Sequence, residues 1–194
     1  ELIADEGDYS VWYKPYGMRS QGSKWGDHTT VYRWAEQHLQ PQRNAFLVHR
    51  LDRAASGLIL IAHSKKMATI LSDLFQQRKI DKRYKVIVHG HPAQAVMRME
   101  SELDGKTAIS KFTLLEYDKQ RDRSLLEVRI ETGRKHQIRR QLSECGLPVV
   151  GDRLYGRTAD EQDLQLVAVR LAFRISDEEA QKVYMLALDK HPHL

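Results

Sequence analysis

Residues 49–62 read HRLDRAASGLILIA, and this stretch contains one of the most apolar runs in the chain. Its second half, SGLILIA, is continuously apolar instead of alternating, which predicts a central β-strand covered on both faces. Its first half places Arg50, Asp52 and Arg53 directly before that strand. A lone carboxylate between two guanidinium groups at the end of a core strand is more than an ordinary turn requires. We therefore take Asp52 as a candidate functional residue.

The sequence around this strand alternates between helix and hairpin patterns. Ser64 is a candidate cap for a following helix, and Gly146 and Pro148 are expected to end a later one. Residues 18–28 have the composition of a surface loop. The remaining expected elements are a strand before Lys14, a helix from Thr29 or Thr30, a strand at RYKVIVHG, a hairpin of 106–117 with 124–132, a helix over 135–145 and a strand over 164–173. Because hairpins are mixed with helices, an α+β fold with a mixed, mostly antiparallel sheet and flanking helices is favoured over repeating βαβ units.

The length of 194 residues predicts a single domain, residues 1–194, with a core that needs no disulfide. The single cysteine, Cys145, excludes an internal disulfide and favours a reducing, cytoplasmic setting. No stretch approaches the ~18 consecutive apolar residues of a membrane span, so no membrane association is expected. The chain opens at Glu1 without a signal-peptide pattern. A monomer is the default expectation.

Positive charge is concentrated in two short segments. The chain carries 31 Lys and Arg against 26 Asp and Glu, a formal net charge of +5. Basic residues crowd into 78–85 and 134–140, while much of the compensating acid lies in 159–180. This distribution favours a polyanionic partner such as nucleic acid, although solvated helix and strand faces can carry similar runs.

Several other classes of function lack their motifs. The glycine-rich G-x-G-x-x-G and Walker signatures are absent, so no nucleotide cofactor is expected. The histidines lack the Cys pairs or the H-E-x-x-H spacing of a zinc site, so no metal is expected. No G-x-S-x-G motif supports a serine hydrolase.

The expected helix over 135–145 begins with an unusual choice of charge. Arg134, Lys135 and His136 add positive charge where a helix already presents free N–H groups, which favours an anion there unless the side chains extend into solvent. Ile138, Leu142 and Cys145 share the expected core face, and Arg139 lies beside them. A half-buried guanidinium needs an anionic partner, and Asp52 is the candidate. Such a pair, taken alone, is also compatible with a structural salt bridge.

Tyr84 has two possible roles. It alternates with Val86 and Val88 on one strand face, where most strand tyrosines pack in the core. Its ring could also stack on a base, and its hydroxyl could pass a proton.

Three motifs together resemble those of the RluA-type pseudouridine synthases. They are HRLDRAASGLILIA, KRYKVIVHG and GRKHQIRRQLSECGLPVVGDRLYG, in this order and at this spacing. The segments VWYKPYGM and LQLVAVRLAF also resemble the family, so the resemblance covers the chain from about Tyr9 to Phe173. It implies the catalytic fold of that family without an S4-like domain, and isomerisation of uridine to pseudouridine in rRNA or tRNA, with ribosomal RNA slightly favoured. It also implies that the reaction uses no cofactor or metal.

The resemblance assigns roles to individual residues. Asp52 matches the catalytic aspartate that attacks the flipped nucleotide, at the ribose or at the base. Tyr84 matches a tyrosine that stacks on uracil and is a candidate for removing the C5 proton, and Arg139 matches an arginine that pairs with the aspartate. Arg50 matches an arginine that helps to occupy the space left by the flipped nucleotide. The expected RNA-binding residues are Arg50, Arg53, Lys82, Arg83, Arg134, Lys135, His136 and Arg140.

Some positions depart from the usual family pattern. They are Ala55, Arg140 with Gln141, Leu147 and Val167, and none is a proposed catalytic position. They bear on the choice of substrate more than on the reaction. The alternative function is a catalytically silent RNA-binding protein with the same fold, which would bind RNA without isomerising it.

Overall fold

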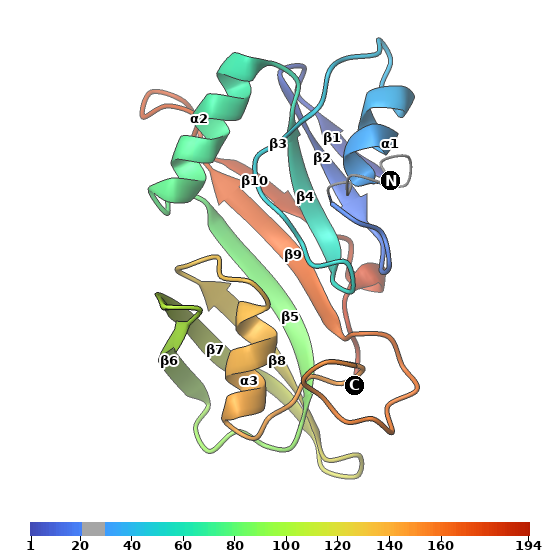
Figure 1. The fold of residues 1–194 in the computed structure, drawn as a ribbon, viewed down its shortest axis with the longest axis vertical. Helices are drawn as coiled ribbons and strands as arrows, with labels where there is room; N and C mark the ends of the chain where they lie inside the picture. The colour runs from blue at the N-terminus through green and yellow to red at the C-terminus, as the bar shows by residue number, and fades with distance from the viewer. Residues whose placement is uncertain (21–29) are drawn as a thin grey trace. The chain divides into compact units, whose positions relative to one another are not determined.

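The computed structural model describes residues 1–20 and 30–194, and Figure 1 shows their helices and strands. Two compact units are present. Unit 1 comprises Glu1–Asp81 and Arg170–Leu186, and unit 2 comprises Lys82–Val169 and Ala187–Leu194. The expected surface loop at 18–28 lies mostly outside the described residues. A single catalytic domain over residues 1–194 stays a prediction.

Unit 1 is built around strand β4. Its seven residues, Ser56–Ala62, are all buried, as the continuous apolar run predicted. Antiparallel pairing joins β4 to β2 (Tyr9–Lys14) and to the short β3 (Phe46–Leu47), and joins β2 to β1 (Leu2–Asp5). Unit 1 also contains the second half of β9 (Leu166–Phe173), from Arg170 on, which pairs antiparallel with β10 (Lys182–Met185).

Two capped helices accompany this sheet. Helix α1 (Val31–His38) has Thr30 as its N-cap, and α2 (Lys65–Gln76) has Ser64, whose side chain accepts a hydrogen bond from the amide of Met67. Helix α2 packs on β4 and β3. It buries Met67, Leu71 and Leu74, one stripe at helical spacing.

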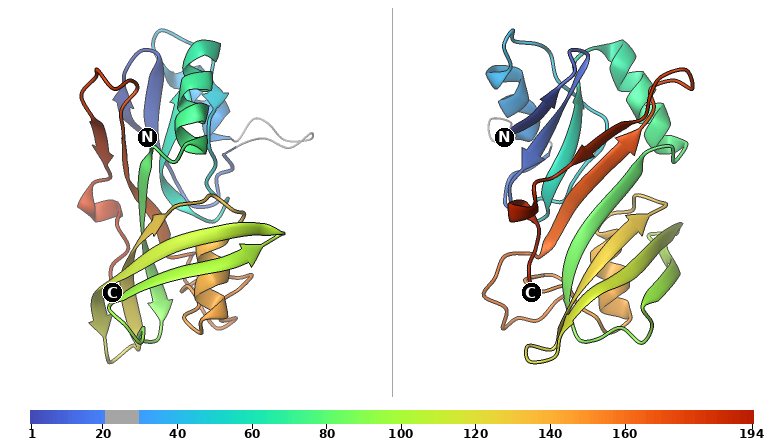
Figure 2. Two further views of the ribbon diagram at one scale, coloured as in Figure 1. Left: turned by 90° about the vertical axis from the view of Figure 1, so that its left-hand side faces the viewer. Right: turned by 180° about the vertical axis from the view of Figure 1, so that it is seen from behind.

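Unit 2 contains a meander of antiparallel strands. Its order is β5-β8-β7-β6, formed by β5 (Asp81–His89), β8 (Arg123–Ile130), β7 (Lys106–Asp118) and β6 (Val96–Leu103). The β7–β8 hairpin confirms the pairing expected from sequence. Helix α3 (Gln137–Glu144) lies along one face of these strands, and Figure 2 shows the same arrangement from two further directions. A short 3₁₀ helix, η1 (Leu188–Lys190), lies near the chain end.

The segment between α3 and β9 is tied to β5. Val149 forms an antiparallel bridge with Val88, and the amide of Val150 donates to the carbonyl of Ile87 at 2.9 Å. Nε2 of His89 lies 2.9 Å from both carboxylate oxygens of Asp160. These bonds hold the loop after α3 in a fixed path, which matters because that loop carries a partner of Arg139.

The predicted α+β class is confirmed. Every strand pair whose register is described above is antiparallel. One detail of the core was wrong: Cys145 is exposed, because α3 ends at Glu144 and Cys145 forms its C-cap. None of the helices in the described ranges is long and apolar enough to cross a membrane.

Candidate active site

Asp52 lies in unit 1, on the loop that leads into β4. Leu51 before it is buried, and the Asp52 side chain is half-buried. A turn follows, closed by the amide of Ala55, which donates to the carbonyl of Asp52 at 3.1 Å. The carboxylate is therefore carried on a short, hydrogen-bonded turn at the end of a buried strand.

The two arginines next to Asp52 differ. Arg50 is exposed. Arg53 donates from Nε to the carbonyl of Gly17 at 3.0 Å, and the amide of Gly17 donates back to the Arg53 carbonyl at 2.9 Å. Gly17 has φ +79°, a conformation that favours glycine, so this turn is suited to its residue. Arg53 thus links the loop after β2 to the loop that carries Asp52.

Tyr84 lies in unit 2, on β5. Only 6% of the residue is exposed, and it pairs in register with Val128 of β8. Lys82, two residues earlier and therefore on the same strand face, is also buried, and its Nζ lies 5.1 Å from the Tyr84 ring centroid. This cation–π contact gives the ring a positively charged neighbour. Arg83 points to the opposite face and pairs with Glu127 at 3.3 Å.

Helix α3 begins at Gln137, two residues later than predicted. The Gln137 side chain accepts hydrogen bonds from the Thr132 hydroxyl at 2.7 Å and from the amide of Arg134 at 3.0 Å. His136, just before the helix, has φ 52°, in the left-handed region. Its Nδ1 forms a 2.9 Å hydrogen bond with the hydroxyl of Tyr155. The start of α3 is thereby fixed by side chains of unit 2.

Arg139 is almost fully buried and binds a carboxylate that the sequence analysis did not consider. Its Nε and Nη2 donate to Oδ2 and Oδ1 of Asp152 at 2.8 and 2.7 Å. Oδ1 also accepts from the amides of Leu154 and Tyr155. Burial acts to raise the pKa of Asp152, but the bonds from Arg139 and from these amides outweigh it and hold that pKa below its usual range. Asp152 is therefore a charged, bidentate partner that fixes the guanidinium plane.

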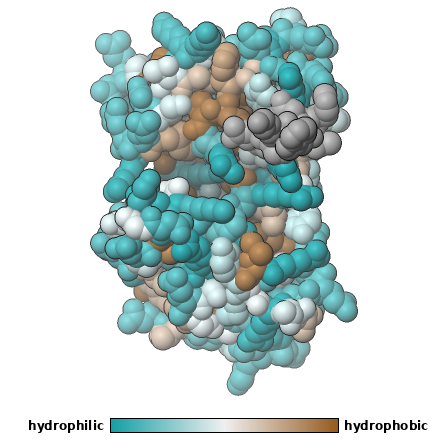
Figure 3. Space-filling model, in the orientation of Figure 1, coloured by the Kyte–Doolittle hydropathy of each residue, from teal (hydrophilic) through white to brown (hydrophobic). Residues whose placement is uncertain are grey.

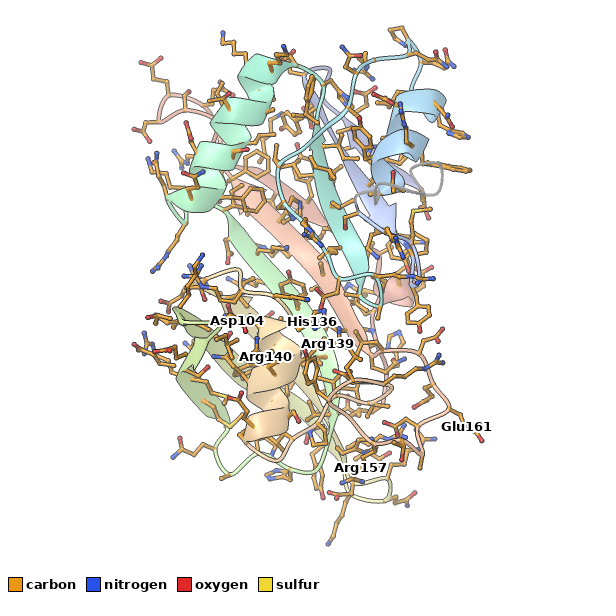
Figure 4. The ribbon with its side chains drawn as sticks, viewed as in Figure 1. Asp104, His136, Arg139, Arg140, Arg157 and Glu161 are labelled. Atoms are coloured by element: carbon orange, nitrogen blue, oxygen red, sulfur yellow. The ribbon has the colours of Figure 1, made fainter. Side chains whose placement is uncertain are left out.

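The other predicted RNA-binding residues of unit 2 have varied surroundings. Arg134 donates from Nε to the carbonyl of Thr107 at 2.9 Å, and Lys135 is exposed. Arg140 donates to Asp104 at 3.0 Å, and Figure 4 labels both of these together with His136 and Arg139. The face of unit 2 that carries α3 is mostly hydrophilic in Figure 3.

Four of the five residues that depart from the family pattern are buried, and the fifth, Arg140, is partly exposed. Ala55, Leu147 and Val167 pack in the interior, and Nε2 of Gln141 donates to Ser101 and to the carbonyl of Ala108. We therefore expect these positions to affect packing before they affect contact with a substrate. Within residues 1–20 and 30–194, no three His, Cys, Asp or Glu side chains gather as they would around a metal ion.

Comparison with known proteins identifies similar chains. The model of the RNA pseudouridylate synthase family matches residues 8–144. An uncharacterized RNA pseudouridine synthase of Aquifex aeolicus is 33% identical over 189 residues, which cover 87% of this chain and 60% of the relative. The ribosomal large subunit pseudouridine synthase D of Zymomonas mobilis is 33% identical over 127 residues, which cover 58% of this chain and 39% of the relative. The chain thus spans about two fifths to three fifths of the length of these relatives.

Solved structures show the same fold. Human RNA pseudouridylate synthase domain containing 4 has a TM-score of 0.78 at 21% identity, with 97% of this chain and 88% of the human chain covered. Human RNA pseudouridylate synthase domain containing 1 has a TM-score of 0.76 at 20% identity, with coverages of 97% and 91%.

Proposed function

The chain belongs to the RNA pseudouridylate synthase family, as the resemblance of its three motifs predicted, and we propose that it converts specific uridines of structured RNA to pseudouridine. The family match, which includes Asp52, Tyr84 and Arg139, is the observation that carries this proposal. Ribosomal RNA is the favoured substrate over transfer RNA, because one of the relatives is named a ribosomal large subunit enzyme. A cytoplasmic monomer is the proposed form of the protein.

In the proposed reaction Asp52 is the nucleophile. Its carboxylate attacks the flipped nucleotide, the bond between N1 and C1′ of the ribose breaks, and the freed uracil turns. A bond then forms between C5 and C1′, the bond between Asp52 and the nucleotide breaks and restores the carboxylate, C5 loses its proton, and N1 gains one, so the product is an isomer of the substrate. The half-buried turn that carries Asp52 supports this role, because a nucleophile must be held in one orientation and yet remain accessible.

Tyr84 and Arg139 are the other proposed catalytic residues. Tyr84 would stack on the uracil and accept the C5 proton, and the ammonium of Lys82 lies over its ring. Arg139 would keep Asp52 charged and oriented. The place of Arg139 in the third motif supports this assignment, and the two bonds to Asp152 fix its guanidinium plane within unit 2.

Arg50 and the basic residues of unit 2 would bind the RNA. Extruding a base costs a few kcal/mol of lost stacking, which Arg50 would help to offset in the space left by the nucleotide. The exposed Arg50 and Lys135 are the strongest candidates for such contacts. Arg53, Lys82, Arg83, Arg134, His136 and Arg140 already have partners within the protein, so we expect them to contribute less to affinity.

The test is the substitution Asp52→Asn, which keeps the size of the side chain and removes the nucleophile. Wild-type protein and the variant are incubated with total RNA, and pseudouridines are mapped by reverse-transcription stops after carbodiimide treatment. We expect wild-type protein to produce defined stops and the variant to produce none. Binding of RNA by wild-type protein without any stop would instead favour the alternative, a catalytically silent RNA-binding protein.

A further inference from the structure

We propose that Lys14 is a positioning residue for Asp52: its buried ammonium fixes the backbone beside the carboxylate and is the counter-charge of that carboxylate within unit 1. This inference rests on the proposed function, because the role of Lys14 is defined by the use of Asp52 as a nucleophile. The residue type alone does not predict this role, because lysine side chains are usually exposed.

The side chain of Lys14 is completely buried at the end of β2. Among the described residues it is one of the largest side chains with no exposed surface, at 0% exposure. Its Nζ donates to the carbonyls of Met18 at 2.8 Å, Pro15 at 3.2 Å and Arg53 at 3.4 Å. Three donors thus meet three carbonyls, two from the loop after β2 and one from the residue that follows Asp52.

Backbone carbonyls satisfy the hydrogen bonds of an ammonium group but not its charge. A buried cation is costly unless an anion compensates it. Burial lowers the pKa of Lys14 to about 8, and the negative charge of Asp52 acts in the opposite direction. The half-buried carboxylate of Asp52 thus partly compensates the charge of the buried ammonium, and the carbonyl of Arg53, the residue after Asp52, ties Lys14 to the same loop.

A second link fixes the other side of Asp52. The Ser20 hydroxyl donates to the carbonyl of Leu51 at 2.8 Å and accepts from the amide of Leu51 at 3.1 Å. Together with the reciprocal bonds between Gly17 and Arg53, this means that the segment 14–20 holds the residue before Asp52 and the residue after it. Asp52 itself therefore has little freedom to change its position along the chain.

A lysine with a purely structural role would donate hydrogen bonds to the same three carbonyls without any electrostatic interaction with Asp52. The two possibilities are separated by the pKa of Lys14, followed through the chemical shift of its ¹³Cε in protein labelled at lysine. The signal is assigned from its absence in Lys14→Met. We expect Asp52→Asn to lower the pKa of Lys14 by about one unit, because an attractive charge is lost. The matched control, Asp73→Asn on the exposed side of α2, should leave it unchanged, and an unchanged value in Asp52→Asn would overturn the proposal.

The catalytic consequence is tested by single-turnover kinetics on transcribed large-subunit ribosomal RNA. We expect Lys14→Met to reduce the rate constant ~100-fold at saturating protein while the Kd for the RNA changes less than two-fold, since a small misplacement of a nucleophile has an effect of this size. Lys119→Met, in the exposed β7–β8 turn, is the matched control with an unchanged rate. A Lys14→Met rate within two-fold of wild type, or a loss of RNA affinity alone, would overturn the proposal.

If Lys14→Met does not fold, the lysine signal is assigned from its absence in Lys14→Arg, and the titration of Lys14 in wild type and in Asp52→Asn still decides. If wild-type protein forms no pseudouridine in any RNA, the proposed function fails. The electrostatic interaction between Lys14 and Asp52 is still measured, because the pKa of Lys14 is determined without any activity assay.

Discussion

Replacing Asp152 by Asn tests whether the buried ion pair with Arg139 holds this part of unit 2 together. The asparagine keeps an oxygen at the position of Oδ1, so the amides of Leu154 and Tyr155 retain their acceptor. The new NH₂ group, however, faces a donor of Arg139 where Oδ2 accepted a bond at 2.8 Å. Side-chain exposures of 4% for Arg139 and 0% for Asp152 mean that water cannot replace the lost charge.

Removing one partner of such a buried pair costs about 3–5 kcal/mol. We expect a loss near 3 kcal/mol in the free energy of unfolding, because the Tyr155 ring, 5.3 Å from the guanidinium carbon, still stabilises the cation. Urea unfolding followed by circular dichroism at pH 7 measures the loss. Asp163→Asn, whose exposed carboxylate lies 3.8 Å from Arg153, is the matched control and should cost less than ~0.5 kcal/mol.

The pH dependence gives a second check on the same pair. Because the pKa of Asp152 is lowered in the folded protein, the folded state binds fewer protons than the unfolded state as the pH falls, and the stabilisation is lost on acidification. The difference between wild type and Asp152→Asn should therefore be full above the ordinary pKa of an aspartate and shrink below it. A loss under ~1 kcal/mol at pH 7 would refute the claim that Asp152 is the charge partner of Arg139.

Two further predictions concern Gly151 and Lys14. A Cβ added at Gly151, which has φ +77°, would lie 2.2 Å from the carbonyl oxygen of Asp163, so Gly151→Ala should cost about 3 kcal/mol or more in a thermal unfolding experiment. Gly105→Ala has a similar φ of +72° but open space, and should cost only about 1 kcal/mol; equal losses would contradict the steric argument. Burial lowers the pKa of Lys14 from 10.5 to about 8, so the unfolded state binds more protons than the folded state between these values. The stability of wild type should therefore rise relative to Lys14→Met by up to about 3 kcal/mol from pH 8 to 10.5, and a flat difference would show that Lys14 is not a buried cation.

Elements with a strong hydrophobic signal could be predicted from the sequence. The run at Ser56–Ala62 and the apolar stripe of α2 are buried in the structure. Both were predictable because apolar runs and stripes mark the faces that pack in the core. Strand β6 was missed, because Val96–Leu103 has only Leu103 buried and its polar residues give no core face. An edge strand is held by backbone pairing with β7, which leaves little trace in the residue types.

The candidate site was predictable to a similar degree. Asp52, Tyr84 and Arg139 stay predictions from their places in the three motifs. Arg139 was expected to be half-buried beside an apolar stripe, whereas it is almost fully buried because it pairs with Asp152. Asp152 was missed, because it lies in a loop whose sequence predicts only a turn, and a contact across that loop has no periodicity. Lys14 was missed as a buried residue for a related reason: its burial depends on carbonyls from two loops, and backbone groups carry no sequence signal.

The role of Asp52 as the nucleophile of a uridine isomerisation is tested most directly by the amount of pseudouridine that Asp52→Asn makes. Liquid chromatography with mass spectrometry of nucleosides from RNA treated with equal amounts of wild type and variant gives this number. We expect pseudouridine above background with wild type and none with the folded variant, although the variant still binds the RNA. Formation of pseudouridine by Asp52→Asn at the wild-type rate would contradict the role of Asp52 as the nucleophile.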